Sequence, residues 1–345
     1  MGNQSRQRVK VNNMNRTIID KAYAHCEQIC RNASTTFYAS FSALEYDKRR
    51  AVHAVYALCR WVDDIVDGDE ETIMLADAEL MKQTQERDTL VREIHAGKSP
   101  ADSEEVYFSR LMSLVSIRNH LASASKQKIT ADNHPVFIAI QDVFKRYPIR
   151  LQDFETILEG MEDDLFPVQC NTWDELRAYC YKVASAVGLV LIEIYGYDDR
   201  AARLHAIDLG IQMQLINVLR DVNEDLERGR IYLPVGVLNE YNIDVKDLKN
   251  PKLAKMQNWK AFILEYLEVV RRHQDSALHL FEYLEVRSQI QPQIMLQAYI
   301  QIFEEILRRS GDIFSSRLSI SLKNKLRLWV RINYLKFKAR FTQSS

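Results

Sequence analysis

The chain has 345 residues, and 47% of them are hydrophobic, so it holds enough apolar material for a large buried core. Lys and Arg number 46 against 47 Asp and Glu, and this balance gives no global positive field, which argues against a nucleic-acid partner. Only 10 glycines and 7 prolines occur, so long stretches contain nothing that interrupts a helix, and we predict an all-α protein.

The first residues, 1–16, are polar and basic and contain no apolar run. We predict a flexible tail there rather than a signal peptide or an anchor. No later stretch reaches the roughly 18 apolar residues of a membrane-spanning helix, so we expect a cytoplasmic protein, soluble or peripheral at a membrane. Five cysteines, an odd number in a large chain, indicate reduced thiols.

Helical periodicity extends from about residue 18 to residue 310. We predict the main helices at about 47–66, 76–94, 151–162, 173–195, 200–226 and, as a pair, 258–310. The weakly patterned segment 101–133 is predicted to be an insertion, either a loop or a surface helix. No repeat and no Gly-, Ser- or Pro-rich linker marks a boundary, so we predict one domain over 17–341.

The first chemical signal lies at the end of the helix predicted at 47–66. At about 100° per residue, four polar positions share one face of this helix, namely Tyr56, Arg60, Asp63 and Asp67. The rest of the helix is apolar. The carboxylates therefore project from a helix that is otherwise suited to burial.

A second stripe of the same kind ends the helix predicted at 200–226. Its members, which also share one face, are Gln214, Asn217, Asp221 and Asp225. A single acidic pair one turn apart is expected by chance and usually lies on a solvated face. Two stripes inside apolar helices are different, because unpaired buried charge is strongly unfavourable and a metal ion relieves it. Mg²⁺ held by a few carboxylates and by substrate phosphates is a common arrangement.

Arginines near the stripes suit the oxygens of a diphosphate, since guanidinium binds such groups through two parallel hydrogen bonds. They are Arg60, Arg220 and Arg230. An apolar cavity with aromatic faces would shelter a carbocation, and Tyr56, Phe37 and Tyr179 are candidates. The pattern favours ionisation of an allylic diphosphate, and it also explains why no nucleophile or catalytic triad is evident.

The motifs resemble, in order, those of the phytoene and squalene synthase family, whose members join prenyl diphosphates head to head. The matching segments are 34–38, 50–67, 160–165, 179–188, 214–225 and 228–234. The resemblance implies a single-domain isoprenoid-synthase helical bundle with a central cavity. It departs from the family pattern at Ser185, where glycine is usual, and at Phe303, where tyrosine is often found.

Site residues follow from the resemblance, position by position. A Mg²⁺ cluster would be held by Asp63, Asp67, Asn217, Asp221 and Asp225, with Gln214 in support. Diphosphates would be held by Arg60, Arg220, Arg230 and Tyr232, and the catalytic set would comprise the four aspartates with Tyr56 and Arg60. The remaining substrate contacts would be Ser34, Phe37, Phe41, Tyr179, Val183 and Gly188.

The implied reaction has two ionisation steps, with a cyclopropyl diphosphate intermediate that rearranges to a linear hydrocarbon. Phe37 and Phe41 lie one helical turn apart, and the resemblance implies that this region lies along a hydrophobic tunnel. Two rings would shorten such a tunnel, which favours two farnesyl diphosphates and a thirty-carbon product. The alternatives are that Phe41 is simply a core residue and that geranylgeranyl diphosphate gives forty-carbon phytoene. The sequence does not decide whether NADPH reduces the product to squalene.

Two other functions are alternatives to head-to-head condensation. A terpene cyclase or chain-elongating synthase also binds Mg²⁺ through aspartates, but the second stripe and the loop after it argue against that class. A non-catalytic relative that acts in assembly would tend to lose aspartates, and all four are present. The basic aromatic segment 322–341 is suited either to an anionic membrane surface or to a last helix packed on the core.

Overall fold

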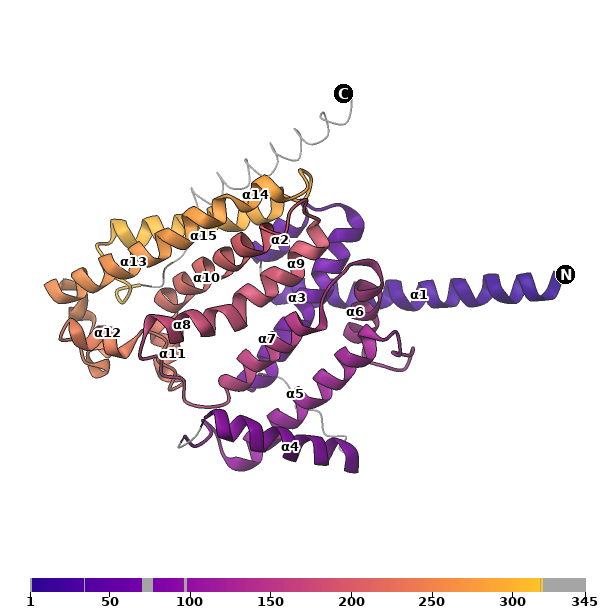
Figure 1. The fold of residues 1–345 in the computed structure, drawn as a ribbon, viewed down its shortest axis with the longest axis horizontal. Helices are drawn as coiled ribbons and strands as arrows, with labels where there is room; N and C mark the ends of the chain where they lie inside the picture. Colours follow the sequence, from indigo (N-terminus) through magenta and orange to yellow (C-terminus); the bar gives the residue numbers. More distant parts are fainter. Residues whose placement is uncertain (1, 34, 70–76, 96–97, 317, 319–345) are drawn as a thin grey trace, which may run out of the picture.

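The computed structural model describes residues 2–33, 35–69, 77–95, 98–316 and 318, and for residues 2–15 and 35–37 it describes the backbone only. The predicted contact residue Ser34, the side chain of Phe37 and the segment 322–341 therefore lie outside the described part. Within that part all regular elements are helices (Figure 1), which confirms the predicted all-α class.

The helices follow one another without a strand in the described ranges. They are α1 (Gly2–Ala33), α2 (Thr35–Phe41), α3 (Tyr46–Asp67), α4 (Ala78–Ile94), α5 (Glu104–Ser125), α6 (Pro135–Arg146), α7 (Leu151–Asp163), α8 (Trp173–Cys180), the π-helix η1 (Tyr181–Ser185), α9 (Ala186–Tyr195), α10 (Ala202–Arg220), α11 (Val222–Glu227), α12 (Val235–Glu240), the 3₁₀-helices η2 (Val245–Lys249) and η3 (Pro251–Lys255), α13 (Gln257–Leu278), α14 (Leu280–Tyr283) and α15 (Ile290–Arg308).

The core forms where α3, α7, α9 and α10 pack together in the middle of the molecule. Helices α13 to α15 cover one side of this group, and α4 and α5 lie on the opposite side (Figure 1). Large apolar side chains such as Phe154, Trp259 and Tyr266 are fully buried between the helices. Burial of this apolar surface is the main stabilising contribution to such a bundle.

The N-terminal part of the chain is helical. Helix α1 starts at Gly2 and its first half extends away from the other helices (Figure 1). The predicted flexible tail over 1–16 is therefore a continuation of α1 from residue 2 onward. That this part is flexible, and that 17–341 forms one domain, stay predictions.

The segment 101–133 differs from the expected surface loop or helix. It contains α5, and ten of the 22 residues of α5 are buried, among them Leu111, Leu114 and Ile117. Helix α5 packs against α4, α6 and α7. Apolar residues lie all around this helix, so no single amphipathic stripe was visible in the sequence. That the segment is an insertion stays a prediction.

One described run, Trp173–Tyr195, is long and apolar enough to cross a membrane by length and composition alone. The sequence-based expectation that no stretch is long and apolar enough to span a membrane is therefore wrong for this run. In the fold the run is α8, η1 and α9, packed against α7 and α10. A core helix of a soluble protein passes the same test of length and composition.

Two predicted helices are interrupted. The helix predicted at 173–195 contains the π segment η1, and the helix predicted at 200–226 breaks at Asp221, where φ is −106° and ψ is 11°. Asp221 N–H still donates to Asn217 O at 2.8 Å, and Asp225 N–H donates to Asp221 O at 2.9 Å. The turn therefore continues through the break, and the second stripe keeps its spacing.

Candidate active site

The first acidic stripe lies in the last two turns of α3. The helix ends at Gly68, whose φ of 83° is left-handed, and the Gly68 N–H donates to the carbonyls of Asp64 and Ile65. Glycine adopts this conformation without strain, and it is the usual way to close a helix. This ending places Asp67 in the last turn of α3, where its carboxylate faces the loop that follows α11.

At Asp67 the first stripe contacts the loop that follows the second stripe. Its carboxylate forms ion pairs with Arg228 and with Arg230, the latter at 3.0 Å from Arg230 Nη1 to Asp67 Oδ1. The Arg230 side chain is only 14% exposed, whereas that of Arg228 is 48% exposed. The structure therefore brings the end of α3 to the end of α11, as the two-stripe hypothesis requires.

The loop after α11 is held in place by an isolated parallel bridge. Ile231 N–H donates to Val168 O at 2.7 Å, and Cys170 N–H donates to Ile231 O at 3.0 Å. This pairing fixes the neighbouring Arg230 and Tyr232 beside the end of α7. Residues more than 60 positions apart in sequence thus share one site.

Asp164 is a site residue that the sequence analysis did not include. It is 7% exposed and accepts hydrogen bonds from Tyr232 Oη at 2.9 Å and Tyr179 Oη at 3.1 Å. The two tyrosine rings stack with centroids 4.5 Å apart. Burial raises the pKa of the Asp164 carboxyl to about 6. In the sequence, the adjacent aspartates at 163 and 164, within the matching segment 160–165, could have indicated this site residue.

Burial and mutual repulsion make the ionised carboxyl groups of both stripes electrostatically unfavourable unless a cation is bound. Burial, followed by the charge of Asp67, raises the pKa of Asp63 to about 6. Burial, followed by the charge of Asp221, raises the pKa of Asp225 to about 7. Carboxylates that repel each other in a partly buried site favour a bound cation.

Arginines on or beside the stripes form ion pairs with their carboxylates. Arg60 pairs with Asp63 at 3.3 Å and also with Asp64. Arg220 Nε donates to Asp221 Oδ1 at 2.8 Å. These arginines, which we predicted to bind diphosphate, therefore have their guanidinium groups beside the aspartates of the site.

An elongated cavity of about 250 Å³ adjoins the second stripe. Six of the predicted residues line it, namely Phe41, Tyr56, Val183, Gly188, Gln214 and Asn217. Most other lining side chains are aliphatic, contributed by α3, α9, α10 and α15. Tyr299 of α15, which the sequence analysis missed, also lines the cavity, and its hydroxyl donates to Asn217 Oδ1 at 3.0 Å.

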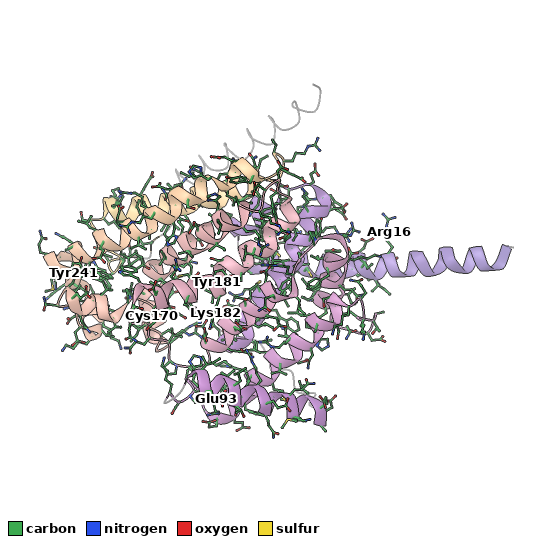
Figure 2. All side chains as sticks on the ribbon, in the orientation of Figure 1. Arg16, Glu93, Cys170, Tyr181, Lys182 and Tyr241 are labelled. Atoms are coloured by element: carbon green, nitrogen blue, oxygen red, sulfur yellow. The ribbon has the colours of Figure 1, made fainter. Side chains whose placement is uncertain are left out.

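The π-helix η1 shapes one wall of this cavity. Figure 2 shows Tyr181 and Lys182, which begin η1, in the middle of the molecule, where η1 packs against α7 and α10. Ser185 Oγ donates to Ile207 O at 2.7 Å, so the residue that departs from the usual glycine anchors η1 to α10. Widened turns of this type often occur at functional sites.

Within the described residues, no three Asp, Glu, His or Cys side chains converge to form a complete metal site. Each stripe supplies two carboxylates and polar neighbours instead. Such a donor set fits Mg²⁺, which keeps waters and takes phosphate oxygens as ligands, better than it fits a metal that needs an all-protein cage. The residues present are thus compatible with the expected metal.

The profile of the squalene/phytoene synthase family matches residues 30–324. The chain belongs to this family. Its members are prenyltransferases, so the predicted family and enzyme class are confirmed.

Relatives and solved structures of this family agree with the fold described above. Phytoene synthase 2 of Solanum lycopersicum, a chloroplastic protein, is 28% identical over 90% of this chain and 89% of its own. The 15-cis-phytoene synthase of Synechococcus elongatus is 28% identical over 89% of this chain and 91% of its own. A dehydrosqualene synthase structure is 25% identical, covers 92% of this chain and 98% of its own, and superposes with a TM-score of 0.71.

A squalene synthase structure, HpnC from Alicyclobacillus acidocaldarius, matches at 19% identity with a TM-score of 0.68 over 85% of this chain and 96% of its own. At this identity the likeness supports the fold alone. The family match and the fold agree on a helical isoprenoid-synthase architecture.

Proposed function

We propose that this protein condenses two prenyl diphosphates head to head in a Mg²⁺-dependent reaction, with farnesyl diphosphate as the preferred substrate. The observation that carries the proposal is the position of the apolar cavity, which extends from the second acidic stripe into the core. A charged diphosphate and a long apolar tail need these two environments side by side.

The protein's own residues supply binding, orientation and exclusion of water. Asp63, Asp67, Asp221 and Asp225 would hold Mg²⁺, with Asn217 beside them. Bound Mg²⁺ supplies charge stabilisation for the departing diphosphate. Arg60, Arg220 and Arg230 would turn from the aspartates toward the diphosphate oxygens, since guanidinium binds both groups in the same geometry.

Aromatic rings in the cavity suit a carbocation. The Phe41 and Tyr56 rings meet edge to face with centroids 5.6 Å apart, and both residues line the cavity. A ring face attracts a cation, and the apolar walls exclude the water that would quench it. The double bond of the second prenyl diphosphate would then capture the cation, and loss of a proton from the resulting cation would close the cyclopropane ring of the intermediate.

Chain length separates two candidate products. Phe41 is 2% exposed, its ring centroid lies 5.6 Å from that of His53, and it lines the cavity, so its ring takes up space that a longer chain would need. This favours a fifteen-carbon substrate and a thirty-carbon product. The relatives named phytoene synthase favour the alternative of two geranylgeranyl diphosphates and a forty-carbon product.

The deciding experiment is incubation of the purified protein with Mg²⁺ and farnesyl or geranylgeranyl diphosphate, with and without NADPH, followed by mass analysis of the extracted hydrocarbon. We expect a thirty-carbon product from farnesyl diphosphate, and its hydrogen count distinguishes dehydrosqualene from squalene. A forty-carbon product alone would establish the phytoene alternative. If folded protein forms no coupled product from either substrate, the proposed function fails. The remaining candidates would then be a cyclase and a non-catalytic assembly protein.

A further inference from the structure

The cavity end that lies away from the aspartates is closed by polar side chains that bond to one another. Tyr195 Oη donates to Gln291 Oε1 at 2.6 Å, and Gln291 Nε2 donates to Ser40 Oγ at 3.1 Å. The three residues come from α9, α15 and α2, and their exposed fractions are 2%, 3% and 0%. Tyr195 and Gln291 line the cavity. We call these three residues the floor.

Helix geometry places the floor opposite the aspartates. On α15 the lining extends from Tyr299, which bonds to Asn217 of the second stripe, back to Gln291. Eight residues of helix separate them, which corresponds to about 12 Å at 1.5 Å per residue. On α10 the lining extends from Asn217 back to Ala206, about 16 Å by the same rise.

The backbone that carries the Tyr195 side chain is held by polar contacts of its own. Tyr195 O accepts hydrogen bonds from Lys48 Nζ and from Ser288 Oγ, each at 2.7 Å. Lys48 pairs with Glu285 at 2.5 Å, and the Glu285 side chain is 56% exposed. The helix end that supplies Tyr195 is therefore tied to a partly exposed ion pair through its backbone.

A hydrogen-bonded floor resists displacement more than an apolar one. An aliphatic side chain yields to a longer ligand by changing its rotamer. If Gln291 moved, the Tyr195 hydroxyl would lose its buried acceptor, and leaving a buried polar atom unsatisfied is strongly unfavourable. The contacts join three helices, so a shift of one residue also strains the other two.

We propose that the Tyr195–Gln291–Ser40 floor sets the longest prenyl chain that the cavity accepts, with Gln291 as the specificity-determining residue. The inference rests on the proposed function, because it takes a prenyl tail as the occupant of the cavity. Phe41 lines the same cavity, and the floor closes the end that lies away from the aspartates.

The test measures binding of unreactive prenyl thiolodiphosphates with fifteen, twenty and twenty-five carbons to the Mg²⁺-supplemented protein by calorimetry. Gln291→Ala removes the side chain, Gln291→Leu keeps similar volume without hydrogen bonds, and Tyr195→Phe removes one hydroxyl. Gln293→Ala on the same helix, outside the cavity lining, is the matched control.

In the wild type we expect an abrupt loss of affinity beyond one chain length. Gln291→Ala should improve binding of the next longer analogue relative to the accepted one by at least about tenfold. Gln291→Leu and Tyr195→Phe should shift the same ratio less but in the same direction, and Gln293→Ala should leave it unchanged. Circular dichroism of each variant establishes that it is folded.

The outcomes separate this inference from the proposed function. If the wild type binds no analogue and forms no coupled hydrocarbon, the proposed function fails and the floor inference fails with it. If the wild type binds and condenses but the ratio stays unchanged in folded Gln291→Ala, Gln291→Leu and Tyr195→Phe, only the floor inference is overturned. A shift caused by Gln293→Ala of similar size would also overturn it.

Discussion

At the scale of single residues, Asp67 joins the two halves of the site. Its carboxylate lies between Arg228 and Arg230, which follow α11, although Asp67 itself ends α3. The two arginines differ in burial, with side chains 48% and 14% exposed. A buried charge pair depends more strongly on both partners than an exposed pair does, because solvent screens the exposed one.

We therefore expect Arg230→Gln to lower kcat/KM for the prenyl diphosphate by about a hundredfold or more, and Arg228→Gln by about tenfold or less. Arg230 also donates to the Asp164 carbonyl at 3.4 Å, so its loss disturbs the buried tyrosine pair as well. Steady-state kinetics with varied substrate measures both effects. Equal losses in the two variants would contradict the ranking by burial.

Phe41 is the residue on which the proposed chain length depends. Phe41→Ala should widen the cavity beside Tyr56 and move the product distribution toward longer hydrocarbons, at a stability cost of about 3 kcal/mol for the lost buried ring. Mass analysis of products from mixed farnesyl and geranylgeranyl diphosphates measures the shift. Phe144→Ala, a ring truncation outside the cavity lining, is the control. An unchanged product length would show that Phe41 is only a core residue.

At the scale of helices, the contact between η1 and α10 decides the shape of the cavity wall. Gly210 of α10 lies so close to η1 that an added Cβ would fall 2.5 Å from Ser185 Cα. This obstacle is backbone, which cannot rotate away. At Gly188 of α9 the nearest atom is Ala206 O, at 3.2 Å from an added Cβ.

Gly210→Ala should therefore lower the free energy of unfolding by about 1–3 kcal/mol, despite the better helix propensity of alanine. Gly188→Ala is the milder comparison, since its contact is looser and the propensity gain of about 1 kcal/mol offsets part of the strain. Urea denaturation measures both variants. A Gly210→Ala variant as stable as the wild type would mean that η1 and α10 separate easily.

At the scale of the whole molecule, the charged site opposes stability when no metal is bound. The pKa of Asp225 in the folded protein, about 7, lies above the ordinary value of 3.8. The folded state therefore binds a proton more tightly than the unfolded state does. Stability from this group rises as pH falls from about 7 toward 4, and the charged form is unfavourable above pH 7.

Asp225→Asn removes this charge. In the presence of EDTA we expect the variant to be more stable than the wild type by about 1–3 kcal/mol at pH 8, since each pKa unit corresponds to about 1.4 kcal/mol. The difference should fall to less than half at pH 5. Urea denaturation at both pH values measures it, and the exposed Asp275→Asn controls for the amide itself. A difference independent of pH would contradict the electrostatic explanation.

Local sequence was sufficient to place the polar residues of each stripe on one helix face. A helix repeats every 3.6 residues, so the spacing of Asp63 with Asp67 and of Asn217 with Asp221 already placed each set on one face. The position of Arg60, Arg220 and Arg230 near the stripes indicated the arginines, and the motif resemblance added Tyr232. The low Gly and Pro content was enough to predict an all-α chain.

Tertiary contacts decided the rest. The break at Asp221, the π segment and the burial of α5 depend on packing against neighbouring helices, which local propensity does not contain. Asp164 became part of the site only through Tyr179 and Tyr232, the latter 68 positions away. Gln291 and Ser40 are 251 positions apart in the sequence. The floor of the cavity therefore forms only because folding brings α2 and α15 together.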